Sequence, residues 1–233
     1  MVKSARALAE VTDELCFGFP VAVTYNVLRY AWEGHRSYLQ QYGNGSKRVL
    51  FVGMNPGPWG MVQTGVPFGE VSAVRDWMKV QAVIGKPNPE HPKRPVQGFA
   101  CERSEVSGRR LWGLFAKRFG TAKLFFTELF VTNYCPLAFM DEAGRNLTPD
   151  KLPTTETKEL QDACDRNLRE VVNIMSPEWV IGIGVYGESR ARSALGEGLR
   201  YGRILHPSPA SPAANKGWAA LAAAQLVKLG VWK

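Results

Sequence analysis

VLFVG (residues 49–53) runs directly into MNPGPWG (residues 54–60). A short run rich in valine and phenylalanine is typical of a buried β-strand, and a cluster of prolines and glycines forces the chain out of that strand into a stiff loop. In an open α/β sheet, ligands bind beyond the carboxyl ends of the strands. The junction therefore predicts that the amide side chain of Asn55 lies in a crevice at the edge of such a sheet.

Apolar runs and helical periodicities alternate along the rest of the chain. They predict strands at residues 47–53, 123–131, 179–183 and 202–205, and helices at residues 20–42, 71–84, 108–119, 157–175, 186–195 and 213–229. Residues 86–107, rich in proline and charged side chains, are expected to form an irregular surface insertion. This alternation favours an α/β/α sandwich, a single domain over residues 1–233, with a central, mainly parallel four-stranded sheet.

The composition of the chain indicates which kinds of partner and which cellular location to expect. The chain has 233 residues, 45% of them hydrophobic, and a formal net charge of +8. The charge favours a polyanionic partner, because cationic side chains release counterions from phosphates, although a basic protein without such a partner is the alternative. Nowhere does an apolar run approach the ~18 residues of a membrane span. Residues 1–10 lack the apolar centre of a signal peptide, so we expect a cytoplasmic protein, nucleoid-associated in a prokaryote or nuclear in a eukaryote.

The four cysteines (Cys16, Cys101, Cys135 and Cys164) are widely spaced and form no C-x-x-C pair. A chain of this size has its own core, so we expect reduced structural thiols rather than a disulfide framework. An iron–sulfur cluster is the alternative, but it normally requires closely spaced cysteines. The histidine and cysteine spacing offers no zinc pattern. We expect neither a metal nor a cofactor, and a monomer without an obligate protein partner.

A second stiff loop, HPSPASP, occupies residues 206–212. Prolines at alternate positions continue neither a strand nor a helix, so they predict a pre-shaped protruding loop. Ser211 is a candidate N-cap, with Pro212 in the first position of the following helix. His206 would lie at the same sheet edge as Asn55, beside a helix N-terminus that favours phosphate, and a stiff loop there suits insertion into a base stack. A rigid connection without a function is the alternative.

Two further side chains are candidates for the same crevice. Asn133 follows a predicted strand, and its amide can donate and accept hydrogen bonds in one plane, as binding a pyrimidine edge requires. The alternative is a turn-forming asparagine. Phe68 offers a ring that could stack on a flat ligand, or it belongs to the core.

GMNPGPWGMVQTGVPFG (residues 53–69) resembles the first motif of the single-strand-selective monofunctional uracil-DNA glycosylases. The similarity continues through GKP (85–87), HPKRPV (91–96), SEVSG (104–108), NYCPL (133–137), HPSP (206–209) and NKGW (215–218). The resemblance implies an enzyme that flips a uracil-type base out of DNA and hydrolyses its N-glycosidic bond, leaving an abasic site. It also implies DNA, single-stranded or duplex, as the partner.

The resemblance implies a role for each matching residue of the pocket. Asn55 would hold the attacking water and His206 would face O2 of the base. Asn133 would bind the N3–H and O4 edge, and Phe68 would stack on the flipped ring. Met54, Gly57 and Met61 would line the pocket, and the loop over residues 57–61 would refuse the methyl group of thymine while admitting a 5-hydroxymethyl group.

We call residues 207–212 the wedge loop. The resemblance implies that Pro207, Ser208, Pro209, Ala210 and Ser211, followed by Asn215 and Lys216, contact DNA and fill the gap that the base leaves. Members of the family tend to carry Arg and Asn where this chain has Ala210 and Ser211. A shorter, uncharged tip predicts weaker opening of duplex DNA without a change in the base chemistry.

Other functions remain open at this point. A sister glycosylase could prefer another base, such as hypoxanthine, or carry an iron–sulfur cluster. A catalytically silent protein that binds damaged or single-stranded DNA is conceivable, because an asparagine at position 55 is no general base. A nucleotide-binding α/β protein is disfavoured, since no G-x-G-x-x-G or Walker loop follows the first strand.

Overall fold

Four parallel strands form the central sheet of the computed structural model, which describes residues 1–233. They are β2 (Val49–Gly53), β3 (Leu129–Asn133), β6 (Trp179–Ile183) and β7 (Arg200–Ile204), in the spatial order β3-β2-β6-β7. All residues of β2 are buried, which explains its uninterrupted apolar sequence. The predicted mainly parallel four-stranded sheet is confirmed.

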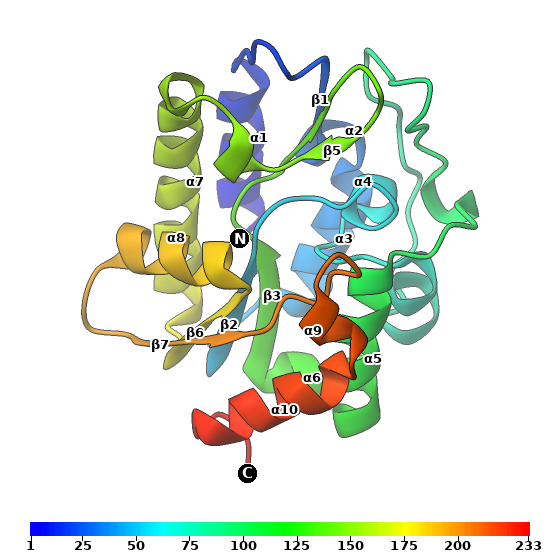
Figure 1. Ribbon diagram of the computed structural model, residues 1–233. Helices are drawn as coiled ribbons and strands as arrows, with labels where there is room; N and C mark the ends of the chain where they lie inside the picture. The colour runs from blue at the N-terminus through cyan, green and yellow to red at the C-terminus, as the bar shows by residue number, and fades with distance from the viewer.

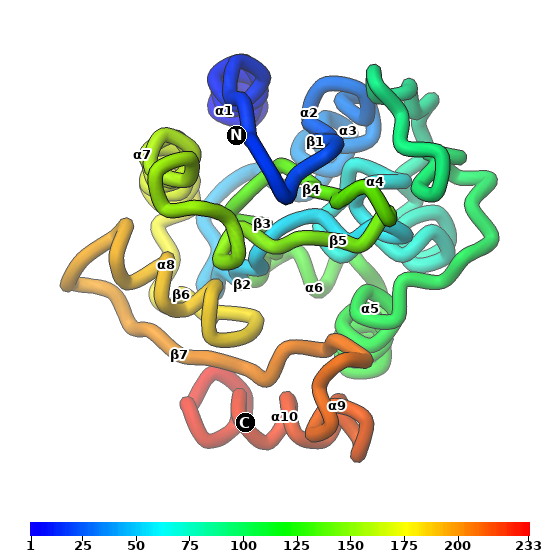
Figure 2. Tube along the Cα trace, turned by 45° about the horizontal axis from the view of Figure 1, so that its top comes forward, coloured from blue at the N-terminus to red at the C-terminus, as the bar shows by residue number.

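Helices cover both faces of this sheet (Figures 1 and 2). On one side lie α7 (Thr154–Met175) and α8 (Val185–Leu195), and on the other lie α5 (Val106–Phe119), α6 (Ala122–Glu128) and α10 (Trp218–Lys228). The predicted α/β/α sandwich is therefore confirmed. A Cβ atom on Gly187 of α8 would lie 2.2 Å from the carbonyl oxygen of Val52, so glycine there allows the helix to approach the sheet closely.

Two longer helices flank the sandwich. The first, α1 (Val2–Asp13), was not predicted and packs along α7. The second, α3 (Trp32–Tyr42), lies beside β3, where the Tyr38 hydroxyl donates to the carbonyl oxygen of Val131 at 2.8 Å. The remaining helical turns are α2 (Val27–Tyr30), α4 (Met61–Thr64), η1 (Ala73–Trp77), η2 (Gly98–Ala100), η3 (Pro149–Lys151) and α9 (Pro212–Asn215). None of the helices combines the length and apolar character needed to cross a membrane.

A second, antiparallel sheet lies over the carboxyl edge of the first, at the top of Figure 1. It consists of β1 (Val23–Asn26), β4 (Leu137–Met140) and β5 (Asn146–Leu147), in the order β1-β4-β5. The sequence did not predict this sheet. Strand β4 begins four residues after β3 ends, so the chain leaves the main sheet and returns directly over its edge.

Four sequence predictions were wrong in detail. Residues 20–42 begin with strand β1 before α2 and α3, and residues 71–84 hold only the short η1, which ends near Lys79 with a left-handed φ of 56°. Residues 123–131 are α6 followed by β3, and residues 213–229 are divided into α9 and α10 at Gly217, which has a φ of 113°. Residues 123–131 were predicted as a strand because the adjacent aromatic residues Phe125 and Phe126 are typical of one. In the structure both belong to the short helix α6, which Thr121 caps, and their side chains are buried.

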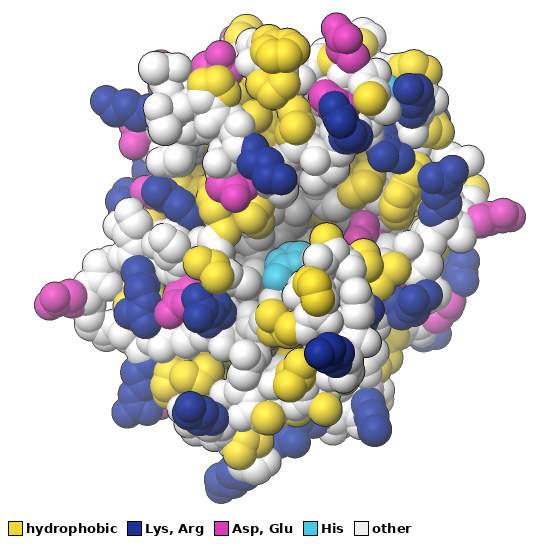
Figure 3. All heavy atoms as spheres, in the orientation of Figure 1, with side chains coloured by type: hydrophobic (Ala, Val, Ile, Leu, Met, Phe, Trp, Pro, Cys, Tyr) yellow, Lys and Arg dark blue, Asp and Glu magenta, His cyan; other side chains and the backbone are white.

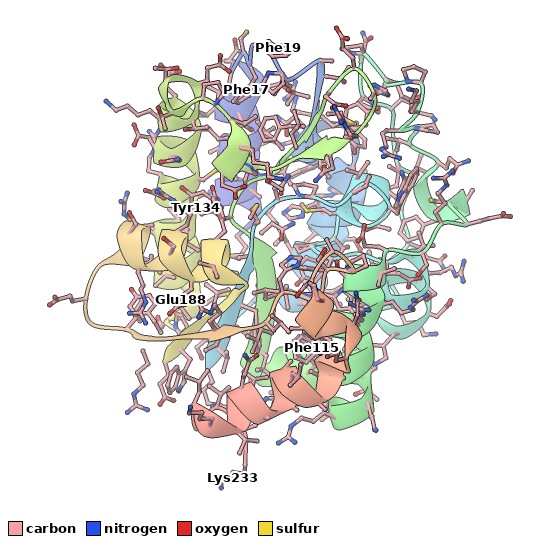
Figure 4. All side chains as sticks on the ribbon, viewed as in Figure 1. Phe17, Phe19, Phe115, Tyr134, Glu188 and Lys233 are labelled. Atoms are coloured by element: carbon pink, nitrogen blue, oxygen red, sulfur yellow. The ribbon has the colours of Figure 1, made fainter.

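Aromatic side chains fill the space between the sheet and α5, α6 and α10. Phe115 of α5 lies in this layer (Figure 4), and its ring centroid is 4.5 Å from that of Phe125 and 5.3 Å from that of Phe51. Residues 86–105 form the irregular insertion that the sequence predicted, apart from η2, whereas the last two residues of the predicted range, Val106 and Ser107, already belong to α5. The insertion is tied to β1, because the Tyr25 hydroxyl donates to the carbonyl oxygen of Arg94 at 3.0 Å.

All four cysteines are free, one exposed and three buried. No group of three or more histidine, cysteine, aspartate or glutamate side chains is arranged to hold a metal ion.

Candidate functional site

A cavity of about 420 Å³ opens at the carboxyl edge of the parallel sheet, under the second sheet. Figure 3 shows the hollow near the middle of this face, with a histidine, in cyan, at its floor. Segments far apart in the sequence line it: Met54, Asn55, Pro56, Gly57, Pro58, Met61, Phe68, Glu105, Ser107, Asn133, Asn146, Thr148, His206, Ser208 and Pro209. The structure thus brings together all seven predicted pocket residues, from the segments that follow β2 and β7 and from the last residue of β3.

Asn55 lies two residues beyond β2, and proline follows it. Its side-chain Nδ2 donates to the carbonyl oxygen of Leu137, the first residue of β4, at 3.2 Å. This contact fixes the orientation of the amide, because Nδ2 points to β4 and Oδ1 has no donor from the protein. Asn55 therefore presents a fixed acceptor that can hold a water molecule.

His206 follows β7 and is a neutral hydrogen-bond donor. The backbone N–H of Ser208 donates to its Nδ1 at 3.1 Å, so Nδ1 is the acceptor nitrogen and the hydrogen is on Nε2. Burial lowers the pKa of the imidazole from 6.5 to about 4, so the ring is uncharged near neutral pH. The wedge-loop backbone thus selects the tautomer of the side chain that lines the cavity.

Asn133, the last residue of β3, carries an unsatisfied acceptor. Its Oδ1 is buried and has no hydrogen-bond partner, while Nδ2 contacts Sδ of Met61 at 3.2 Å. A buried, unpaired carbonyl oxygen costs about 1–3 kcal/mol. A ligand that supplies an N–H to this oxygen and an acceptor to Nδ2 would remove that cost. The amide is therefore arranged for a planar edge with a donor beside an acceptor.

The structure holds Phe68 in a strained conformation beside Asn133 and His206. Its φ of 52° lies in the left-handed region, which costs of order 1–3 kcal/mol for a bulky residue. Trp112 of α5 donates from Nε1 to the Phe68 carbonyl oxygen at 3.0 Å, and the Phe68 ring centroid is 5.9 Å from that of His206. A Cβ atom on Gly53 would lie 2.5 Å from Cε2 of Phe68, so this glycine makes room for the ring.

The end of β3 is anchored to the helices behind it. Tyr134, labelled in Figure 4, lies between β3 and α7, where its hydroxyl donates to Oδ1 of Asp165. Arg190 of α8 pairs with both carboxylate oxygens of Asp165, at 2.8 and 2.9 Å. Because these three side chains are largely buried and mutually bonded, they fix the strand end that carries Asn133.

Glu105 is a pocket residue that the site prediction missed, although it belongs to the SEVSG motif. Its Oε2 accepts the backbone N–H of Trp59 at 3.3 Å, and it occupies the space where Gly57 and Gly60 lack side chains. Burial raises the pKa of its carboxyl group, and the hydrogen bond from Trp59 opposes that effect. Glu105 thereby ties the Pro56–Gly60 loop to the start of α5.

The wedge loop lies at the rim of the cavity and is held by α5. Arg110 donates from Nη1 to the carbonyl oxygen of Pro207 at 2.9 Å and from Nη2 to Oδ1 of Asn215 at 2.8 Å. Asn215 in turn donates to the carbonyl oxygen of Pro209 at 2.9 Å. Ser211 caps α9 as predicted, with its side chain accepting the N–H of Ala214.

The predicted DNA-contacting residues of the wedge loop, and Lys216 after it, differ in exposure and in whether they line the cavity. Ser208 and Pro209 line the cavity, whereas Pro207 is buried against the protein. Ala210 at the tip is exposed and Ser211 is half-buried. Lys216 is exposed, lies outside the cavity and forms no ion pair.

Comparisons with known proteins agree with this architecture. A model of the "Uracil DNA glycosylase superfamily" matches residues 40–227. The chain is 48% identical to the single-strand selective monofunctional uracil DNA glycosylase of Bos taurus, over 98% of this chain and 89% of that protein. It is 49% identical to the protein of the same description in Rattus norvegicus, over 94% and 80%. The crystal structure of wild-type Pedobacter heparinus SMUG2 shares the fold, with a TM-score of 0.69 and 14% identity, over 98% of this chain and 97% of that one.

Proposed function

Because this chain belongs to the uracil DNA glycosylase superfamily, we propose that it extrudes uracil from DNA and hydrolyses the bond between N1 of the base and C1′ of the deoxyribose. The product is an abasic site and the free base. The observation that carries the proposal is the unpaired Oδ1 of Asn133 in a cavity that also holds the Nε2–H of His206.

Asn133 selects uracil by its hydrogen-bonding edge. The N3–H of uracil satisfies the orphaned Oδ1, and O4 accepts from Nδ2. Cytosine has no N3–H and carries an amino group in place of O4, so both groups of the amide would stay unpaired against it. Sites built on such hydrogen bonds reject the mismatched analogue strongly, because buried polar groups are left without partners.

The chemistry depends on stabilising the leaving group. When the C1′–N1 bond breaks, its electron pair stays on the base, and positive charge develops on the sugar. The Nε2–H of His206 donates to O2, where the negative charge of the departing uracil gathers. Through its Oδ1, Asn55 holds the water that attacks C1′, and it positions this water without accepting its proton, because an amide is not a base at neutral pH. The proton that the water loses passes to solvent, and the uracil anion takes one up to leave as the neutral base.

The Pro56–Gly60 loop and Met61 line the cavity near Asn133 and form the wall at C5 of the base. Glu105 stiffens that wall from behind. A rigid wall refuses the methyl group of thymine, whereas a polar 5-hydroxymethyl group replaces an ordered water and is accepted. The proposal therefore includes 5-hydroxymethyluracil as a second substrate.

The wedge loop fills the gap that the extruded base leaves in the stack of DNA bases. The enzyme acts on single-stranded and duplex DNA, as a monomer without an obligate protein partner. Its place in the cell is with the DNA, in the nucleoid or the nucleus. Flipping costs a few kcal/mol in a duplex and less in a single strand, so the single strand is the better substrate.

The test of this function is a panel of single strands that differ only in one base: uracil, 5-hydroxymethyluracil, hypoxanthine, thymine and cytosine. The measurement is the formation of alkali-labile abasic sites and of free base. We expect efficient excision of the first two and very slow excision of thymine and cytosine. Preference for hypoxanthine, or equal excision of thymine, would contradict the assigned pocket.

The neutral state of His206 predicts an unusual pH profile. Protonating Nδ1 would break its hydrogen bond from Ser208, and burial delays this step until the pH falls to about 4. In single-turnover assays at saturating enzyme, we therefore expect no inflection from His206 between pH 8 and about 5, and a falling rate below that range. An inflection near 6.5 that disappears in His206→Gln would contradict a neutral ring.

The same shift predicts a change in stability. The pKa of His206 is about 6.5 in the unfolded chain and about 4 in the folded chain. Burial lowers the pKa of His35 from 6.5 to about 4 in the same way. The unfolded state thus binds more protons in this window, so the free energy of unfolding falls as the pH drops from 6.5 through about 4. Chemical denaturation at pH 7, 5.5 and 4.5 measures the change.

The tip of the wedge loop predicts how well the enzyme opens a duplex. In Ala210→Arg/Ser211→Asn, a charged side chain joins the tip, and asparagine keeps the cap of α9. We expect the excision rate on duplex DNA to rise several-fold while the rate on single strands stays within twofold. The measurement is the ratio of the two rates, with Ala210→Gln as the uncharged control. An unchanged ratio would show that the tip does not limit opening.

A further inference from the structure

A long groove, separate from the cavity, runs between α5 and α10 on the far side of the wedge loop. It encloses about 840 Å³ and is lined by twelve residues, none of them acidic. Figure 1 shows α9 beside α5, and α10 running from below α9 toward the lower left. Small side chains of α10, including Ala219, Ala220 and Ala223, keep its floor low.

The rim of the groove is cationic. Arg110, Lys117 and Arg118 of α5 line it, and none of them forms a salt bridge with a carboxylate. Lys117 and Arg118 are exposed, and the Arg118 guanidinium carbon lies 4.4 Å from the centre of the Trp232 ring. Nη2 of Arg118 also donates to the backbone oxygen of Lys233 at 3.4 Å, and Arg110 is bonded to Pro207 and Asn215. None of the three pairs with an aspartate or a glutamate, so their charges complement a polyanion.

The groove is continuous with the wedge loop. Asn215 lines the groove and donates to Pro209, which lines the cavity, so one hydrogen bond joins the two sites. Arg110 also belongs to both, because it lines the groove and holds Pro207. A strand whose extruded nucleotide occupies the cavity would leave over the wedge loop directly into this groove.

We propose that the groove between α5 and α10 binds the sugar–phosphate backbone of the DNA strand on one side of the extruded nucleotide. This inference rests on the proposed function for its substrate. Lys117 and Arg118 neutralise phosphates there, outside the cavity that holds the reacting bond. The groove extends the footprint of the enzyme along the strand without touching the reacting atoms.

The experiment compares Lys117→Gln/Arg118→Gln with Lys158→Gln/Arg166→Gln, which removes the same charge from exposed positions on α7, across the sheet. The affinity for a 25-nucleotide single strand containing uracil is measured at several salt concentrations. We expect the groove variant to bind roughly tenfold more weakly at low salt, and its salt slope to fall by about 1.4, as two lost phosphate contacts on a single strand require. The α7 variant should bind like the wild-type protein.

Measuring the affinity for strands that extend only 5′ or only 3′ of the uracil shows on which side of the uracil the groove contacts the DNA. We expect the groove variant to lose affinity for one of the two extensions and to bind a strand of five nucleotides like the wild-type protein. Lys117→Gln alone, which disturbs no packed ring, should show about half of the slope change. Equal losses in both double variants, or no dependence on strand length, would overturn the proposal.

Other occupants are distinguishable. If sedimentation shows a wild-type dimer that the groove variant loses, the groove binds a second copy and the proposal is wrong. Failure of the proposed function is a separate result, because it appears as a wild-type protein that makes no abasic sites, whether or not the groove variant binds DNA more weakly.

Discussion

Replacing His206 with leucine should slow the excision of uracil from single-stranded DNA by roughly 10²–10³-fold, the usual effect of removing one donor from a developing anion. Leucine fills a similar volume but offers no hydrogen to O2. The effect should appear in the single-turnover rate at saturating enzyme rather than in DNA affinity, because the Nε2–H bond strengthens as charge moves onto the base.

His206→Gln is the matched control, since its amide can return a donor to the cavity. We expect it to recover part of the lost rate. The prediction fails if His206→Leu excises uracil at close to the wild-type rate. It also fails if the leucine variant loses only affinity, because His206 would then bind substrate and transition state equally well.

Replacing Asn55 with alanine should cost at least as much, roughly 10²–10³-fold or more, because the attacking water then has no fixed acceptor. The structure gives a reason for the size of the effect: Leu137 holds the amide so that Oδ1 stays available. Binding of a uracil-containing strand should change little, since the cavity and the wedge loop remain.

This variant also separates an enzyme from a catalytically silent DNA-binding protein. An enzyme loses the formation of abasic sites in Asn55→Ala and keeps its binding, and we expect that result. Wild-type protein that binds strands and leaves every base in place would favour the silent protein. Asn55→Ala with near wild-type excision would remove Asn55 from the mechanism.

Much of the parallel sheet and the pocket could be predicted because their signals are local. A buried strand reads as an unbroken apolar run, and the prolines and glycines after β2 and β7 mark where the chain leaves the sheet. Parallel strands end at one edge, so Asn55, Asn133 and His206 were expected to meet, and all three line one cavity.

The second sheet could not be predicted in the same way, because its strands are short and pair only through tertiary contacts. Strand β5 has two residues, and Asn146 at its start lines the cavity without any sequence signal of its own. Glu105 is similar. Its role follows from the glycines at 57 and 60, which leave space for a side chain more than forty positions away in the sequence.

In the proposed mechanism, the neutral imidazole of His206 and the fixed amide of Asn55 hold a single extruded uracil between them. Proton–nitrogen NMR of the three histidines tests it most directly, in the presence of a single strand carrying 2′-fluoro-2′-deoxyuridine, whose electron-withdrawing fluorine slows bond breaking. We predict that the Nε2–H of His206 moves downfield and becomes protected from exchange, while its Nδ1 stays unprotonated. A matched strand with cytosine should leave the signal unchanged. A His206 signal that does not respond while the uracil strand is bound, or a ring protonated on both nitrogens, would contradict the account.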